Sequence, residues 1–206
     1  MKRGLIGVIL VLCMSHVVYA ADGPYFSGHL GATVLMDSTF SDTVIPGSTA
    51  EAEFDTGLVA AAAVGYKTGM MRLEGEFSYR SNGLDKVTDL GGPFSASGDV
   101  TAFSGMLNGY VDLDNQTAIT PFLMAGIGFS NISLDGVVID GFPFFDEDDT
   151  VFAYQGGAGV GIALAPNLML DVEYRYFATT DPEFSDNFLE AEYGTHNFMA
   201  GVRVSF

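Results

Sequence analysis

The chain has 206 residues, and its 26 acidic and eight basic residues give a formal net charge of −18 at pH 7. Binding to phosphates requires a basic surface, so this charge excludes nucleic acid as a natural partner. Cys13 is the only cysteine, which excludes a disulfide framework and a cysteine-based metal site.

The first twenty residues have the pattern of a cleaved secretory signal peptide. A basic pair at positions 2 and 3 precedes an apolar run, Leu5–Met14, and Val18-Tyr19-Ala20 places small residues before a cleavage site. We expect cleavage before Ala21. This removes two basic residues and no acidic residue, so the mature charge is −20. Residues 21–206 are expected to form a single domain, because no linker or second module is visible.

After the leader, eight segments alternate between apolar and polar residues with the period of a β-strand. No apolar run approaches the ~20 residues that a membrane-spanning helix needs, whereas the segments match the ~9–11 residues of a spanning strand. An apolar-rich exported chain of this kind is expected to form a closed barrel. The predicted strands are residues 25–34, 57–66, 71–80, 100–112, 119–131, 150–164, 168–177 and 195–206.

The third segment, residues 71–80, shows the clearest alternation. Met71, Leu73, Phe77 and Tyr79 are predicted to face outward, and Arg72, Glu74, Glu76, Ser78 and Arg80 to face inward. A soluble barrel of the lipocalin type has an apolar interior, and these inward charges argue against it. The pattern therefore predicts an all-β fold, an eight-stranded antiparallel up-and-down transmembrane β-barrel.

Long and short spacers alternate between the predicted strands. The long spacers (35–56, 81–99, 132–149 and 178–194) hold 19 of the 26 acidic residues, and three short polar turns join the other strand ends. Outer-membrane barrels have long loops outside and short turns in the periplasm, and an even strand number leaves both termini on the periplasmic side. We therefore expect an acidic outer end.

Four stretches carry a resemblance to a known family. They are Pro121–Phe129, Gln155–Gly161, Asp171–Tyr176 and Gly201–Phe206. On these motifs the chain resembles small outer-membrane β-barrels of the OmpA/OmpX-like superfamily, also described as the outer membrane protein β-barrel domain. The resemblance implies an outer-membrane location, contact with membrane lipid and lipopolysaccharide, and an assembly signal for the barrel-assembly machinery formed by Val202, Val204 and Phe206.

The inward charges are expected to pair with one another, because a lone buried charge is very costly. Seven residues form the predicted lumen charge network: Arg72, Glu74, Glu76, Asp171, Glu173, Arg175 and Arg203. The main interpretation is a structural plug of salt bridges in a lumen just wide enough for side chains. The alternative is a narrow, OmpW-like path for ions or small solutes, since small inward residues (Ala61, Ala63, Gly65, Gly157, Gly159 and Gly161) leave room.

The third long spacer contains two candidate binding features. Phe142, Phe144 and Phe145 are candidates for a contact surface, because exposed aromatic patches mark such surfaces. The run Asp146-Glu147-Asp148-Asp149 is a candidate divalent-cation site, although it lacks the spacing of an EF-hand loop.

The expected function is a structural and surface-interaction role of the adhesin type, exerted through four acidic outer loops by a monomer. The alternative is the narrow channel or transporter described above. No enzyme activity and no cofactor are expected, because Ser27 and His29 lie near the periplasmic end and His196 has no serine two residues on, unlike the motif of lipid A deacylases.

Overall fold

The computed structural model describes residues 22–36, 38–42, 49–54, 56–89, 92–113, 115, 117–139, 142–143, 147–180, 183–184, 189–190 and 193–206. Within these ranges only the backbone is described for residues 38–42, 49–54, 84–89, 92–97, 134–139, 142–143, 147, 183–184 and 189–190. The predicted signal peptide lies outside the described residues.

Eight long strands form the body of the molecule. They are β1 (Gly23–Leu35), β4 (Gly57–Thr68), β5 (Met71–Asp89), β6 (Gly92–Asp112), β7 (Ile119–Ile139), β9 (Glu147–Ala165), β10 (Leu168–Thr179) and β13 (Gly194–Ser205). Five short strands accompany them: β2 (Ser38–Asp42), β3 (Thr49–Phe54), β8 (Phe142–Pro143), β11 (Glu183–Phe184) and β12 (Leu189–Glu190).

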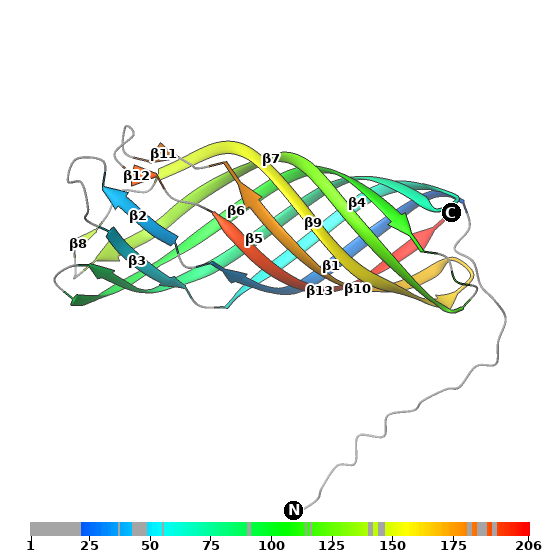
Figure 1. Ribbon diagram of the computed structural model, residues 1–206, viewed down its shortest axis with the longest axis horizontal. Helices are drawn as coiled ribbons and strands as arrows, with labels where there is room; N and C mark the ends of the chain where they lie inside the picture. The colour runs from blue at the N-terminus through cyan, green and yellow to red at the C-terminus, as the bar shows by residue number, and fades with distance from the viewer. Residues whose placement is uncertain are drawn as a thin grey trace, which may run out of the picture.

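The eight long strands close into a barrel (Figure 1). Each pairs antiparallel with the next along the chain, and β1 pairs with β13 from Tyr25 opposite Ser205 to Leu35 opposite Thr195. Closure pairs the backbone polar groups with one another, as a lipid environment requires. The predicted eight-stranded antiparallel barrel is confirmed. No helix in the described part of the chain is long and apolar enough to span a membrane, a finding without bearing on spanning strands.

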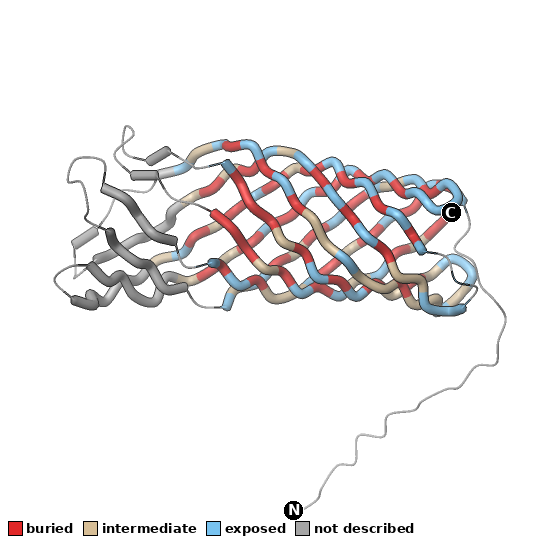
Figure 2. The backbone as a smooth tube through the Cα atoms, in the orientation of Figure 1, coloured by how far each residue is buried: buried red, intermediate tan, exposed pale blue. Residues whose placement is uncertain are grey.

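Burial alternates residue by residue along the strands (Figure 2). From Met71 to Arg80 of β5, every second residue is exposed and every other one is buried. The exposed set is apolar, and Leu30, Leu58 and Phe77 are 70%, 74% and 66% exposed. The buried set is largely polar. The barrel thus has an apolar outside and a polar core, which is the pattern of a membrane barrel.

Four strands run past the alternating segments. The hairpin of β5 and β6 continues to the pair Asp89 and Gly92, and β7 and β9 pair as far as Leu134 and Glu147. The prediction that residues 81–99 and 132–149 are loops was therefore wrong for most of their length. Beyond a membrane both faces of a strand meet water, so a strand there need not alternate and leaves no period-two signal.

The two ends of the barrel differ. At one end, which we call the loop end, β3 pairs with the extension of β5, and β2, β12 and β11 follow in the same sheet (Figure 1). At the other, the turn end, Gly69 has a φ of 56° in the tight turn between β4 and β5, a conformation that glycine adopts without strain. The last residue, Phe206, also lies at the turn end, where its backbone N donates to Pro24 O at 3.1 Å.

Candidate functional site

The lumen holds a balanced set of buried charges. Among the described side chains it contains five Lys and Arg residues and five carboxylates, each at most 6% exposed, together with His29. They are Lys67, Arg72, Arg80, Arg175 and Arg203, and Glu74, Glu76, Asp112, Asp171 and Glu173. The five positive and five negative charges sum to zero. Such a balance allows each buried ion to have an opposite charge nearby, which offsets the free-energy cost of removing it from water.

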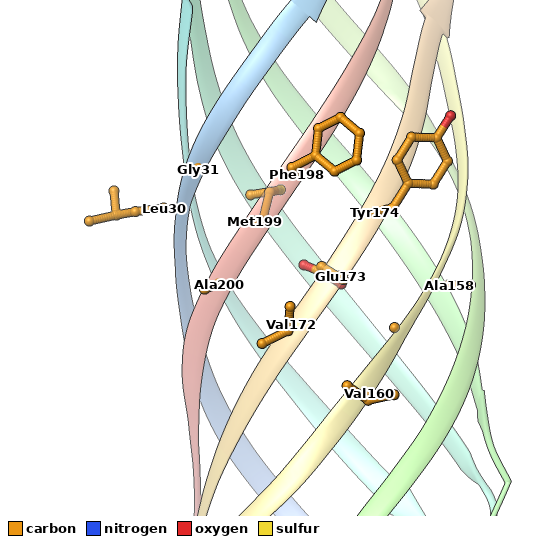
Figure 3. Close-up of a pocket in the computed structure, with 11 residues that line it drawn as sticks. Leu30, Gly31, Ala158, Val160, Val172, Glu173, Tyr174, Phe198, Met199 and Ala200 are labelled. Carbon is orange, nitrogen blue, oxygen red and sulfur yellow. The ribbon is translucent and has the colours of Figure 1, made fainter. Parts of the chain in front are cut away.

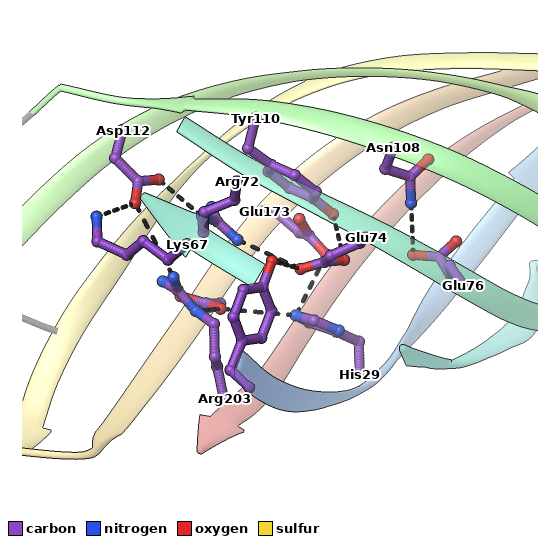
Figure 4. A network of polar contacts seen from close by, with 12 residues as sticks. His29, Lys67, Arg72, Glu74, Glu76, Asn108, Tyr110, Asp112, Glu173 and Arg203 are labelled. Carbon is purple, nitrogen blue, oxygen red and sulfur yellow. Dashed lines mark hydrogen bonds and ion pairs between the residues drawn. The ribbon is translucent and has the colours of Figure 1, made fainter. Parts of the chain in front are cut away.

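Asp112, the last residue of β6, collects cations at the turn end (Figure 4). Its carboxylate accepts from Lys67 Nζ at 2.8 Å and from Arg72 Nε at 2.9 Å, and Arg203 Nη1 lies 4.0 Å away. Arg72 Nη1 is also 3.4 Å from Glu74 Oε1. These contacts join β4, β5, β6 and β13, so the cluster ties opposite walls of the barrel together.

A second cluster lies between β10, β13 and β1. Arg203 donates to Asp171 through Nε and Nη2, both at 3.0 Å, which is the two-pronged geometry of a strong arginine–carboxylate pair. His29 Nε2 lies 3.9 Å from Asp171 and 3.6 Å from Glu173. Asp171, Glu173 and Arg203 all belong to the network predicted from the sequence, and the structure pairs Arg203 with Asp171.

Arg175 of β10 occupies the middle of the lumen. It donates to Glu76 of β5 through Nη1 at 2.5 Å and lies 2.8 Å from Glu173 through Nη2. Asn108 Nδ2 donates to the same Glu76 carboxylate at 3.2 Å, and Gln155 Nε2 donates to Asn108 Oδ1 at 2.8 Å. β5 and β10 stand four strands apart around the ring of eight, so these contacts cross the full width of the barrel.

Tyrosine hydroxyls link the clusters. Tyr25 donates to Glu74 Oε1 at 2.6 Å, and Tyr110 donates to Glu74 Oε2 at 3.1 Å while accepting from Arg175 Nη2 at 3.1 Å. Each buried hydroxyl here has a charged partner, which makes these hydrogen bonds stronger than neutral ones. The turn-end and central clusters are therefore one continuous network.

Arg80 is the exception in the network. It is fully buried, donates to Asn197 Oδ1 at 3.3 Å and Ser78 Oγ at 3.0 Å, and has no carboxylate within 4.0 Å among the described residues. Its guanidinium carbon lies 3.9 Å from the centroid of the Phe177 ring. Cation–π contact and hydroxyl partners replace an ion pair at this position.

A layer of apolar side chains covers Arg80 on the loop-end side. We call this layer the loop-end cap; it consists of Leu35, Val100, Ala102, Met106, Ile132, Val151, Ala153, Phe177 and Tyr193. Tyr193 lies just before β13, and burial raises the pKa of its hydroxyl to about 12, while the nearby Arg80 opposes the shift. The charged network thus lies toward the turn end, and toward the loop end the apolar side chains are mixed with buried polar ones such as Thr33 and Asn82.

The small residues on the luminal side make room for larger ones. A Cβ on Gly159 would lie 2.5 Å from the Phe122 ring, and one on Gly161 would lie 3.0 Å from Asp171 and 3.2 Å from Arg203. The inference that these glycines leave space for water or a channel was wrong, because facing side chains occupy that space.

The family model described as "Outer membrane protein beta-barrel domain" matches residues 5–206. The chain belongs to this family. It is 27% identical to the outer membrane protein PagN of Salmonella typhimurium over 228 aligned residues, which cover 96% of this chain and 95% of PagN. A Rickettsia conorii protein named as a candidate adhesin, RC1281, is 30% identical over 128 residues, 55% of this chain and 51% of that protein.

The crystal structure of the outer membrane protein OprG from Pseudomonas aeruginosa superposes with a TM-score of 0.62 at 11% identity, covering 93% of this chain and all of OprG. At that identity the likeness shows the fold alone. The protein is an outer-membrane β-barrel of a Gram-negative bacterium. Long connections are extracellular in such barrels, so we expect the loop end to face outward.

Three luminal residues of this outer-membrane barrel were missing from the network predicted from the sequence. Lys67 was assigned to a turn, although its position continues the inward parity of Ala61, Ala63 and Gly65. Asp112 was expected to face inward but was not assigned a partner, and Arg80 was not included. Continuing the alternation by one residue would have found Lys67.

The candidate residues of the third long spacer are only partly described. Phe142 belongs to β8, which pairs with β7, and Phe144, Phe145 and Asp146 lie outside the described residues. Glu147 begins β9, and only the backbone of this residue is described. The divalent-cation site therefore stays a prediction.

The two described carboxylates of that run have local partners. Asp148 Oδ2 accepts from Asn131 Nδ2 at 3.0 Å, and Asp149 Oδ1 accepts from Thr150 N at 2.7 Å. Among the described residues no group of three or more His, Cys, Asp or Glu is arranged to hold a metal ion.

The three residues of the predicted assembly signal lie on the outward face near the turn end. Val202 and Phe206 are 48% and 77% exposed, and Val204 is half-buried. Their recognition by the assembly machinery stays a prediction.

Proposed function

We propose that this outer-membrane barrel is a surface-interaction protein of the adhesin type, in which the filled barrel is the anchor and the loop end contacts a partner. The proposal is carried by the separation of charge along the molecule. Residues 21–206 contain six Lys and Arg residues, and five of them are buried in the lumen. Only Lys86, on the extension of β5, is left for the rest of the molecule.

The acidic residues have the opposite distribution. Five of the 26 are luminal, and 19 of the remaining 21 belong to the four connections at the loop end. The outward-facing end therefore has an excess of 18 negative charges. Such a field attracts basic surfaces, speeds their association and repels polyanions. We propose a partner with a basic surface, or one bridged through divalent cations, which the run from Asp146 to Asp149 would help to bind.

The similarity to RC1281, which is named as a candidate adhesin, supports this proposal over 55% of the chain. A narrow channel is the second candidate. It is supported less well, because every described luminal charge except Arg80 lies in an ion pair, and apolar side chains gather toward the loop end of the lumen. We also propose that the protein has no catalytic role, since His29 is buried beside Asp171 and Glu173.

The experiment is an adhesion assay on cells that display the protein. Ser133 lies opposite Asp148, so residues 134–147, which hold four acidic residues and no basic residue, can be replaced by a two-residue Asn-Gly turn without changing the register of β7 and β9. The shortened variant is expected to lose most binding to cultured host cells, and binding by the wild type is expected to weaken as salt rises from about 0.05 to 0.5 M.

The matched control alters the other end of the barrel. Asn115→Ala changes an exposed residue at the turn end, whose side chain accepts a hydrogen bond from Thr117 N within the turn. This variant is expected to leave adhesion unchanged. Equal adhesion by wild type and shortened variant at equal surface abundance would contradict the proposal, as would stronger binding to a polyanion than to a basic protein.

A further inference from the structure

The lipid-facing side carries one polar pair, Tyr174 of β10 and His196 of β13. Tyr174 Oη and His196 Nδ1 are 2.7 Å apart, and their rings stack at 5.9 Å. The ring of Tyr176, which lies on β10 directly opposite His196, is 5.5 Å from the imidazole. Of the Lys, Arg and His side chains that the structure describes, His196 is the only one that is not buried.

The hydrogen bond orients the imidazole. A phenol is the better donor of the two groups, so Nδ1 accepts and the ring hydrogen lies on Nε2. A protonated ring carries a hydrogen on Nε2 as well. In both forms His196 therefore offers an N–H donor on a ring that contacts Tyr174 and Tyr176, and Tyr174 does not use this donor.

An apolar depression lies next to this pair, toward the membrane centre (Figure 3). The registers place two outward rows across β1, β13, β10 and β9, and a third row above them contains Val34, His196 and Tyr176. The middle row is Ala32, Phe198, Tyr174 and Ala158, and the lowest is Leu30, Ala200, Val172 and Val160.

The depression arises from residue size. Ala158 and Ala200 are short beside Leu30, Phe198 and Tyr174, which stand out from the barrel wall (Figure 3). The Tyr174 hydroxyl points along the barrel toward the loop end, where β1 ends (Figure 3). The apolar depression thus lies nearer the membrane centre, and the hydrogen-bond donor lies nearer the loop end. The tail and the headgroup of a lipid are arranged in the same order.

We propose that these residues form a binding site for a phosphorylated glycolipid of the outer leaflet. One acyl chain lies in the depression over Ala200 and Ala158, and the headgroup phosphate accepts a hydrogen bond from His196 Nε2. A phosphate is favoured over a neutral sugar because bonds to an ionised acceptor are about twice as strong. Every other described basic side chain is in the lumen, so His196 is where an anionic headgroup can be met.

The test is native mass spectrometry of the refolded protein in a neutral detergent. The probes are lipid A, phosphatidylglycerol and a galactosyl-diacylglycerol, which has acyl chains but no phosphate. We expect a one-to-one adduct with lipid A that His196→Phe, which keeps a ring but has no donor, weakens roughly ten-fold. Tyr174→Phe, which keeps the ring and releases the imidazole, is expected to weaken it several-fold, and Ala200→Phe fills the depression and should abolish it.

Tyr79→Phe on β5 is the matched control, since it removes an outward hydroxyl from a distant strand and should leave the adduct unchanged. Folding of each variant is checked by the shift in gel migration on boiling. Three results would overturn the proposal: equal binding of the galactolipid, unchanged binding by both His196→Phe and Tyr174→Phe, or binding of phosphatidylglycerol with no binding of lipid A.

Discussion

Arg175 and Glu76 form an ion pair across the full width of the barrel, with Nη1 and Oε2 2.5 Å apart. The two residues are 99 positions apart in the chain and lie on β10 and β5, on opposite sides of the ring of strands. Both side chains are fully buried, and Arg175 also lies 2.8 Å from Glu173. Because this ion pair spans the lumen, side chains fill the barrel at this level.

The first prediction concerns that core. Arg175→Met is expected to lower the free energy of unfolding by about 3–5 kcal/mol, because it leaves Glu76 and Glu173 buried without their cation. The measurement is urea unfolding of the refolded protein in lipid vesicles. It is followed by far-UV circular dichroism, because the chain has no tryptophan for fluorescence. Adding Glu76→Gln to this variant neutralises one stranded carboxylate and should recover part of the loss. A change below about 1 kcal/mol for Arg175→Met would show that water, rather than Arg175, compensates these carboxylates.

The fold was predictable from the sequence because the membrane enforces alternation on every spanning segment. Residues 71–80 specify which side chains enter the lumen, and all eight spanning strands were found in this way. The alternation tells which side chains point into the lumen and which point outward, but not how high each lies along the barrel axis. The partners of Arg175 depend on strand tilt and register, so the contact with Glu76 could not be derived.

The strand extensions were missed for the opposite reason. Residues 84–89 and 92–97 pair as a hairpin beyond the apolar band, where nothing requires one face to be apolar. The polar pair of Tyr174 and His196 was also hidden, because His196 has outward parity and its partner lies on the neighbouring strand. Cross-strand pairs become visible only once the register is known.

The second prediction is that the refolded wild-type barrel does not conduct steadily in a planar lipid bilayer. Luminal ion pairs hold the charged side chains in place, and the loop-end cap, which includes Ile132 and Phe177, fills part of the lumen beside Arg80. Single-channel recording at about 1 M KCl is the measurement. Steady openings that disappear on neutralising Arg203 or Glu173 would contradict a filled lumen and favour the channel alternative.

The third prediction uses two glycines of the barrel wall. A Cβ on Gly31 would lie 2.1 Å from Phe198 O, a backbone atom that cannot move without breaking the pairing of β1 and β13. A Cβ on Gly75 would meet nothing within 4 Å. Gly31→Ala should therefore reduce the refolding yield and lower the free energy of unfolding by about 3 kcal/mol or more, the upper end of the typical cost of overpacking. Gly75→Ala should leave both quantities unchanged. Equal behaviour of the two variants, measured by gel migration before and after boiling, would count against this wall geometry.

The last prediction concerns Tyr193 in the loop-end cap. Its hydroxyl is buried and has no hydrogen-bond partner among the described residues, so Tyr193→Phe should be neutral or stabilising near pH 8. The pKa of this hydroxyl is about 12 in the folded protein and 10.0 in the unfolded reference, so the unfolded chain loses its proton first. The stability contributed by neutral Tyr193 is therefore complete below pH 10 and is lost as the pH rises toward 12, by up to roughly 3 kcal/mol.

Other tyrosines also titrate in this range, so the useful quantity is the difference between wild type and Tyr193→Phe. The free energy of unfolding of the variant should exceed that of the wild type by an increasing margin between pH 10 and 12. Urea unfolding at four pH values measures it. If the variant is instead destabilised by more than about 1 kcal/mol at pH 8, the hydroxyl has a partner, and a constant difference across the pH range would mean that Tyr193 is open to water.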